Sequence, residues 1–185
     1  MPDKPAADAQ AILDFWFGEV GPDGWWLRSA ETDAAIRARF LPLWEQWRLR
    51  LPASFTADAS DALAAVVLFD QFSRNMFRGT PSAFASDAKA LAIAETAIAK
   101  GFVEALNGDE RLFLYLPFEH QENADAQARS LELISALGDP ELTKYALAHK
   151  DIIDRFGRFP HRNAILGRTS TAGELELLKG PGSSF

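Results

Sequence analysis

The stretch from Asp139 to Gly157, DPELTKYALAHKDIIDRFG, decides the fold class. Aspartate is a preferred helix N-cap, proline suits the first helical position, and glycine commonly follows the last turn of a helix. Between these signals, side chains recur at the spacing of one helix face, at Leu142, Ala146, His149, Ile153 and Phe156. The stretch therefore predicts a helix over residues 140–156 that ends at Gly157.

Similar start and stop signals recur along the rest of the chain. They predict further helices over residues 8–17, 29–50, 58–72, 82–100, 109–116 and 123–137, and a short last one that follows a capping box at Thr171 and Glu174. A Gly- and Trp-rich loop is expected over 18–26, and Pro42 is expected to kink the helix over 29–50 or to end its first half. No segment alternates as a strand would. We therefore predict an all-α protein of seven to eight helices, arranged in antiparallel hairpins.

Length and composition suit one intracellular domain. The chain has 185 residues, 48% of them hydrophobic, and no cysteine, which excludes disulfides and thiolate chemistry. We expect a single domain over 1–185, with residues 1–7 disordered and 180–185 as a tail. Neither a secretory leader nor an apolar run that could span a membrane is present, so we expect a cytoplasmic protein without membrane contact.

Charge is unevenly distributed along this acidic chain. The formal net charge is −7, which argues against a nucleic-acid partner. Residues 101–140 hold eight acids against two bases, whereas residues 141–168 hold three acids against six bases. A local basic segment on an acidic protein points to an anionic ligand more clearly than the total charge does.

The segment from Phe69 to Gly79 holds the first candidate site residues. Asp70 and Arg74 are four residues apart, so on a helix they can pair. On a functional interpretation, Asp70 orients an arginine while Arg74 and Arg78 contact an anion. On a structural interpretation, the pair is a salt bridge at a helix end and Arg78 caps carbonyl groups.

The second candidate segment runs from Arg155 to Arg168 and has four arginines and no acid in fourteen positions. A guanidinium offers a planar fork of donors that suits carboxylate or phosphate, so Arg158, Arg162 and Arg168 are candidate anion contacts. The alternative is internal neutralisation, by the four-residue pairs Asp151–Arg155 and Asp154–Arg158 or by the acidic residues of 101–140.

The histidines are the candidate proton carriers. There are three, His120, His149 and His161, and Glu119 lies beside the first. On the apolar stripe of its helix, His149 is either a hydrogen-bonded core residue or a catalyst. With Glu119 or Glu122 the histidines could be drawn as a metal site, but no metal-ligand motif occurs, and we expect neither metal nor cofactor. No nucleophile elbow or nucleotide fingerprint occurs either, so the sequence does not decide whether the protein is an enzyme.

Several motifs together resemble one bacterial family, domain of unknown function 924. They are residues 14–18 (DFWFG), 68–75 (LFDQFSRN) with 78–80 (RGT), 113–119, and 155–168 with its RFGRFPHRN run. The resemblance implies an all-helical, tetratricopeptide-like fold and no established activity, substrate or cofactor. The family usually has His-Ser-Glu-Asp where this chain has residues 120–123, HQEN. A mechanism that needs that serine and second acid would not carry over.

Three functional hypotheses follow. The first is a pocket lined by arginine and histidine that binds a small anionic ligand or the acidic end of a peptide. The second is a tetratricopeptide-like module that binds a protein partner in a groove. The third is a hydrolase or lyase that uses histidine and glutamate for proton transfer. The sequence identifies no ligand and no oligomeric state, and does not show whether the arginine segments and histidines meet in space.

Overall fold

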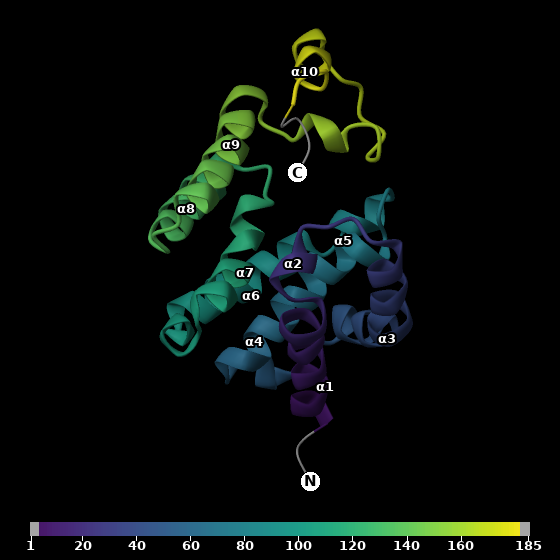
Figure 1. The fold of residues 1–185 in the computed structure, drawn as a ribbon, viewed down its shortest axis with the longest axis vertical. Helices are drawn as coiled ribbons and strands as arrows, with labels where there is room; N and C mark the ends of the chain where they lie inside the picture. Colours follow the sequence, from purple (N-terminus) through teal and green to yellow (C-terminus); the bar gives the residue numbers. More distant parts are fainter. Residues whose placement is uncertain (1–3, 182–185) are drawn as a thin grey trace. The chain divides into compact units, whose positions relative to one another are not determined.

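Helices and turns make up the computed structural model, which describes residues 4–181 and has no strand within them. This confirms the predicted all-α class, and eight continuous helical segments occur in this range (Figure 1). The segments are residues 4–25 (α1 Lys4–Leu13, η1 Asp14–Val20, α2 Gly21–Trp25), α3 (Ala30–Leu49), residues 59–76 (α4 Ala59–Val66, η3 Val67–Phe72, α5 Ser73–Met76), α6 (Asp87–Ala99), α7 (Gly108–Glu119), α8 (Ala124–Ser135), α9 (Pro140–Phe156) and α10 (Ala172–Leu177).

The predicted helix ends are formed by the side chains that the sequence indicated. The Asp139 carboxylate accepts hydrogen bonds from the first backbone N–H groups of α9, and Gly157 ends that helix with a left-handed φ of 69°. At the start of α8, the Asn123 side chain accepts from the backbone N–H of Ala126. Thr171 and Glu174 form the expected capping box at α10. These short-range predictions are confirmed.

The predicted loop over residues 18–26 is wrong. Gly18 lies within the π-helical segment η1, and α2 continues the helix to Trp25. Aromatic packing supports this conformation: the Trp25 indole N–H donates to the Trp16 carbonyl at 2.8 Å, and the Trp25 ring packs 4.8 Å from that of Phe113. A glycine costs a helix only about 1 kcal/mol, which such contacts outweigh.

Proline and the N-terminal residues also depart from the sequence-based expectations. Pro42 lies inside α3, which continues without a break to Leu49, and α7 runs past Pro117 to Glu119. Residues 4–7 belong to α1, although we expected disorder over 1–7. Residues 1–3, like 182–185 of the expected C-terminal tail, lie outside the described range.

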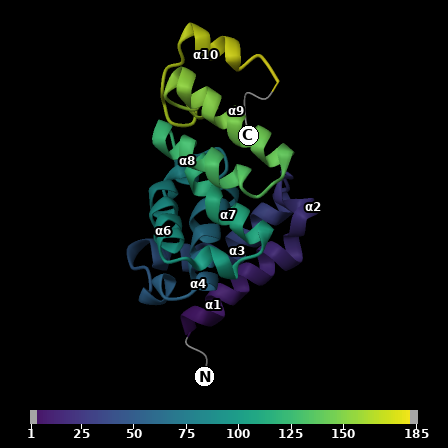
Figure 2. The same ribbon diagram turned by 90° about the vertical axis from the view of Figure 1, so that its left-hand side faces the viewer.

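Contacts between Cα atoms divide the chain into two compact units: Met1–Arg78 with Ser82–Pro117, and Gly79–Pro81 with Phe118–Phe185. We call them unit 1 and unit 2, and the prediction of one domain stays a prediction. In unit 1, α4 packs against both α1 and α6 (Figure 2). Its core holds a chain of edge-to-face aromatic contacts in which Trp16 lies between Phe72 and Phe113.

Unit 2 contains a helical hairpin, formed by α8 and α9, which lie side by side in Figures 1 and 2. After Gly157 the chain turns into the short 3-10 helix η6 (Pro160–Arg162) and then reaches α10. Ile152, Ile153 and the fully buried Phe159 form a small core with Phe156 and Leu177 against it. This core fixes the segment between α9 and α10, which holds most of the candidate residues. Across residues 4–181, no helix combines the length and apolar character that crossing a membrane requires.

Candidate functional site

Unit 2 brings the three histidines and Arg162 into one cluster. His120 follows α7, His149 lies on the last turns of α9, and His161 and Arg162 lie on η6. Three of the four meet at the ring of Phe159: the ring centroids of His149 and His161 are 5.7 Å and 5.6 Å from it, and the Arg162 guanidinium lies over it at 4.5 Å. His120 joins them through its carbonyl, which accepts a hydrogen bond from Arg162. The sequence could not show this convergence, because it depends on the reversal of the chain at Gly157.

His149 is a buried histidine with a defined tautomer. Its side chain is nearly inaccessible, and its Nδ1 lies 2.9 Å from the Tyr145 carbonyl oxygen and 3.4 Å from a Glu119 carboxylate oxygen. A carbonyl only accepts, so Nδ1 carries the hydrogen and donates it. The lone pair of the neutral ring is therefore on Nε2, which makes His149 a hydrogen-bond acceptor on its other side.

The electrostatic surroundings keep His149 neutral. Burial is the largest cause, and it lowers the pKa of His149 to about 3. The hydrogen bond to the Tyr145 carbonyl acts in the opposite direction, whereas positive charge on His120, Arg162 and His161 lowers the pKa further. Arg162, and His120 and His161 when they are protonated, therefore act on the same buried ring of unit 2.

Arg162 is held in place by its own unit. It is only 6% exposed, and its Nη1 donates to the His120 carbonyl oxygen at 3.0 Å. This bond ties η6 to the residue that follows α7, and the stacking on Phe159 fixes the plane of the guanidinium. A charged group that is fixed in this way recognises an anion without a large ordering cost.

Arg168 forms an ion pair with a carboxylate of unit 2, and so holds the segment between α9 and α10 to the residues that follow α7. Its guanidinium forms two hydrogen bonds to the Glu122 carboxylate, at 2.6 and 2.8 Å, and a third to the Asn163 side chain. Glu122 also accepts from the Phe159 N–H at 2.7 Å. Burial by itself raises the pKa of Glu122, but these hydrogen bonds and the charges of Arg168 and Arg162 hold it below its ordinary value.

Arg158 is likewise paired within unit 2, with a partner that the sequence did not indicate. Its guanidinium binds both carboxylate oxygens of Glu174, at 2.6 and 2.9 Å, and the Thr169 carbonyl. Mainly because of Arg158, the pKa of Glu174 falls to about 2. The expected pair Asp154–Arg158 does not form, since Asp154 pairs with Lys150. In place of the expected pairing with Asp151, the Arg155 guanidinium lies over the Phe156 ring.

The remaining predicted residues belong to unit 1. Asp70 is fully buried in the π-helical segment η3, and the predicted pair with Arg74 is confirmed at 3.1 Å. Arg74 also binds the carboxylate of Asp87 through two hydrogen bonds of 2.9 and 3.0 Å. Arg78 forms two hydrogen bonds to Asp33, at 2.7 and 2.8 Å. Sequence reasoning missed both Asp87 and Asp33, because helical spacing carries no signal for partners so distant in sequence.

The candidate residues thus form two sets, Asp70, Arg74 and Arg78 in unit 1 and all others in unit 2. Arg74, Arg78, Arg158 and Arg168 each have a carboxylate partner from their own unit. The contacts of Arg162 include the His120 carbonyl and the Phe159 ring. No group of three or more histidine, aspartate or glutamate side chains within residues 4–181 is arranged to hold a metal ion.

These features define an all-helical protein with a histidine–arginine cluster formed by α9, η6 and the residue that follows α7. The chain belongs to a bacterial family of proteins of unknown function, DUF924, whose model matches residues 12–182. It is similar to the solved structure of a protein of unknown function from Agrobacterium tumefaciens, with 40% sequence identity, a TM-score of 0.91 and coverage of 96% of this chain and 100% of that chain. Among curated proteins, a search finds no significant match.

Proposed function

We propose that this protein binds a small anionic molecule, or the acidic end of a peptide, through the cluster of His120, His161 and Arg162 in unit 2. The observation that carries the proposal is the position of Arg162, which stacks on the ring that His161 also contacts and binds the His120 carbonyl, and so places a permanent positive charge beside both histidines. The same charge stabilises an anion that approaches the two partly exposed histidines.

Fixed donors make the cluster suitable for an oxyanion. Arg162 contributes a permanently charged, planar fork whose position is set by Phe159 and by the His120 carbonyl. His120 and His161 add charge only when they are protonated. Anion binding should therefore strengthen as the pH falls and weaken as the histidines lose their protons.

The geometry offers less support for acid–base catalysis by His149. A general base works best when its pKa lies near the operating pH, and a pKa of about 3 is far below that range. We therefore assign His149 the role of a neutral hydrogen-bond acceptor. The hydrolase or lyase, the protein-interaction module and the cytoplasmic location expected from the sequence all stay predictions.

A thermal-shift screen tests the proposal. Purified protein is melted with acetate, succinate, citrate, inorganic phosphate and an acidic peptide, at a slightly acidic and a slightly alkaline pH. A ligand present at a hundred times its dissociation constant stabilises the folded state by about 2.7 kcal/mol. We expect a carboxylate ligand to raise the melting temperature at the acidic pH only.

Two variants make the screen specific. His161→Asn removes one partly exposed cationic group and should abolish most of the shift. Arg129→Ala is the control: it removes an exposed arginine of α8 that pairs with Glu132, and it should leave the shift unchanged. An equal loss of the shift in both variants, or no shift with any anion in the wild type, contradicts the proposal.

A further inference from the structure

Unit 1 contains a second feature that the sequence did not indicate, an open surface pocket of about 300 Å³. It lies between the first turns of α3 and the end of α5, and its lining residues are Asp33, Ala34, Arg37, Asn75, Met76 and Arg78. Arg78 is the only lining residue that was a candidate from the sequence. The pocket lies wholly within unit 1, so it is independent of the histidine–arginine cluster.

Polar donors in this pocket already converge on an oxyanion, the carboxylate of Asp33. Arg78 donates to it through Nε at 2.7 Å and Nη2 at 2.8 Å, and the Asn75 side-chain amide donates at 2.8 Å. Charge-assisted bonds of this kind are the usual means of binding carboxylate and phosphate oxygens. Asp33 engages these donors, so they hold the pocket wall in place and leave the contact with a ligand to Arg37.

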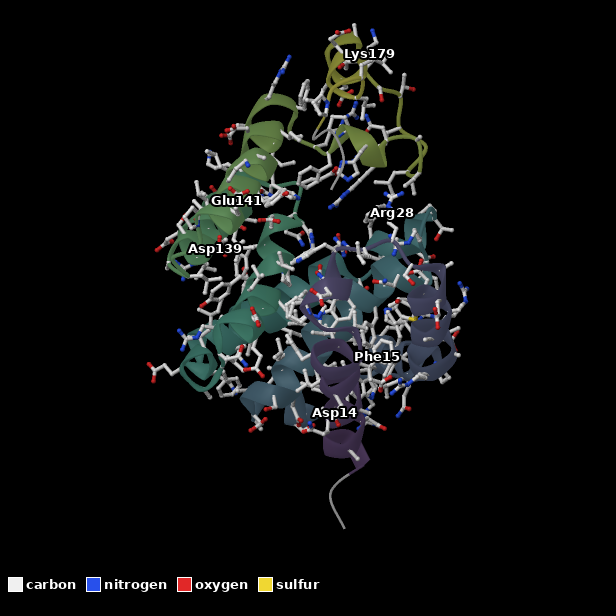
Figure 3. All side chains as sticks on the ribbon, viewed as in Figure 1. Asp14, Phe15, Arg28, Asp139, Glu141 and Lys179 are labelled. Carbon is white, nitrogen blue, oxygen red and sulfur yellow. The ribbon has the colours of Figure 1, made fainter. Side chains whose placement is uncertain are left out.

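Positive charge at the pocket exceeds what Asp33 neutralises. Arg37 uses Nη1 to donate to the Met76 carbonyl at 2.6 Å, and its guanidinium lies over the Phe77 ring at 5.6 Å. Within residues 4–181, no carboxylate forms an ion pair with Arg37. Arg28, labelled in Figure 3, acts on Asp33 and contributes to holding its pKa low. Arg37 and Arg78 therefore line the pocket together with one aspartate, and Arg28 acts on that aspartate from outside the lining, on a chain whose formal net charge is −7.

We propose that this pocket binds the phosphoryl group of a small phosphate monoester. A phosphate monoester carries a charge of about −1.5 to −2 at neutral pH. The lining arginines Arg37 and Arg78, counted with Arg28 outside the lining, exceed the single charge of Asp33 by two, so such a group balances them more fully than a single carboxylate does. Arg37 is exposed and lines the pocket, and its Nη1 donates to Met76, so the phosphoryl group would take its remaining N–H donors. Arg78 and Asn75 fix the opposite wall through Asp33.

Two variants of the pocket should act in opposite directions. Arg37→Ala removes a charge and several donors, and should weaken the binding of inorganic phosphate about tenfold or more. Asp33→Asn removes the internal negative charge and keeps a side-chain oxygen that Arg78 can use as acceptor. It should therefore strengthen phosphate binding.

Arg48→Ala provides the matched control. Arg48 is an exposed arginine of the same helix α3, and its guanidinium lies over the Trp44 ring at 5.3 Å, much as that of Arg37 lies over Phe77. Both variants lose one charge and one cation–aromatic contact, but only Arg37 lines the pocket. Phosphate binding by Arg48→Ala should equal that of the wild type.

The experiment is a titration with inorganic phosphate and with acetate, followed by isothermal calorimetry and by amide NMR shifts. We expect saturable binding of inorganic phosphate that strengthens as the pH rises through its second ionisation, where it gains its second charge. This pH dependence is opposite to that proposed for unit 2, so either proposal can fail alone. Absence of phosphate binding, equal affinity in Arg37→Ala and Arg48→Ala, weaker binding in Asp33→Asn, or tighter binding of acetate than of phosphate would overturn the inference.

Discussion

Replacing His149 with asparagine should make the stability of the protein depend less on pH. The wild type should lose stability between about pH 8 and about pH 5, and the variant should lose much less. In the folded state the pKa of His149 is lowered to about 3, whereas a histidine in an unfolded chain has a pKa of about 6.5. Below the latter value the unfolded chain binds a proton that the folded protein does not. The contribution of His149 is therefore complete above about pH 6.5 and is lost progressively as the pH falls toward about 3.

The size of the effect follows from the two pKa values. Each pH unit within this window costs about 1.4 kcal/mol, so the free energy of unfolding should fall by about 2 kcal/mol between about pH 8 and about pH 5 because of His149 alone. Groups with lowered carboxyl pKa values, such as Glu122 and Glu174, lose their contribution at lower pH. Above about pH 5, the change of the unfolding free energy with pH therefore comes mainly from the histidines.

Urea unfolding at several pH values measures this contribution. His149→Asn keeps a side-chain amide that can donate to the Tyr145 carbonyl, and its stability should vary less with pH than that of the wild type. Ile153→Ala is the control, because Ile153 is buried on the same face of α9 and does not titrate. It should lower stability equally at both ends of the pH range. If His149→Asn retains the full pH dependence of the wild type, then His149 is not the buried, neutral group described above.

Three further predictions concern the framework around the candidate site. Gly157→Ala should destabilise the protein by about 1 kcal/mol in urea unfolding, because Gly157 adopts a left-handed φ of 69°. Gly18→Ala should stabilise it by about 0.5 to 1 kcal/mol, since Gly18 lies in a helical segment with open space for a Cβ. A change of the same sign in both variants would contradict the assigned backbone conformations. Glu122→Gln and Arg168→Ala should each lower the free energy of unfolding by about 1 to 3 kcal/mol. A double-mutant cycle should show that the two losses are not additive, because both variants remove the same ion pair. Additive losses would mean that the pair contributes nothing. Glu174→Gln should speed amide hydrogen exchange in α10, because Glu174 both closes the capping box and binds Arg158; unchanged exchange would show that α10 is held by other contacts.

Short-range features were the most predictable part of this fold. The caps at Asp139 and Thr171 and the helix stop at Gly157 were confirmed, because each depends on residues within one helical turn. Gly18 was misread for a related reason: the contacts that keep it helical come from Trp25 and Phe113, which no local pattern contains.

Charged pairs show the same division between local and distant contacts. Helical spacing correctly paired Asp70 with Arg74, but it also suggested Asp154 for Arg158, which instead binds Glu174. Glu122 and Arg168 are 46 positions apart, and Asp33 and Arg78 are 45 apart. The sequence indicated an arginine-rich segment, while tertiary contacts decide which arginines are bound by carboxylates. Arg37 went unnoticed because an isolated exposed arginine carries no sequence signal.

The histidine ring signals in NMR spectra test the proposed anion site most directly. The chain has three histidines, so single variants of His120, His149 and His161 assign every ring resonance. Spectra are recorded at slightly acidic pH while succinate, phosphate or an acidic peptide is added. We expect saturable shifts of the His120 and His161 rings with at least one of these ligands, and a His149 ring that stays neutral throughout. Ring signals of His120 and His161 that move with none of these ligands, or a His149 ring that protonates near neutral pH, would contradict it.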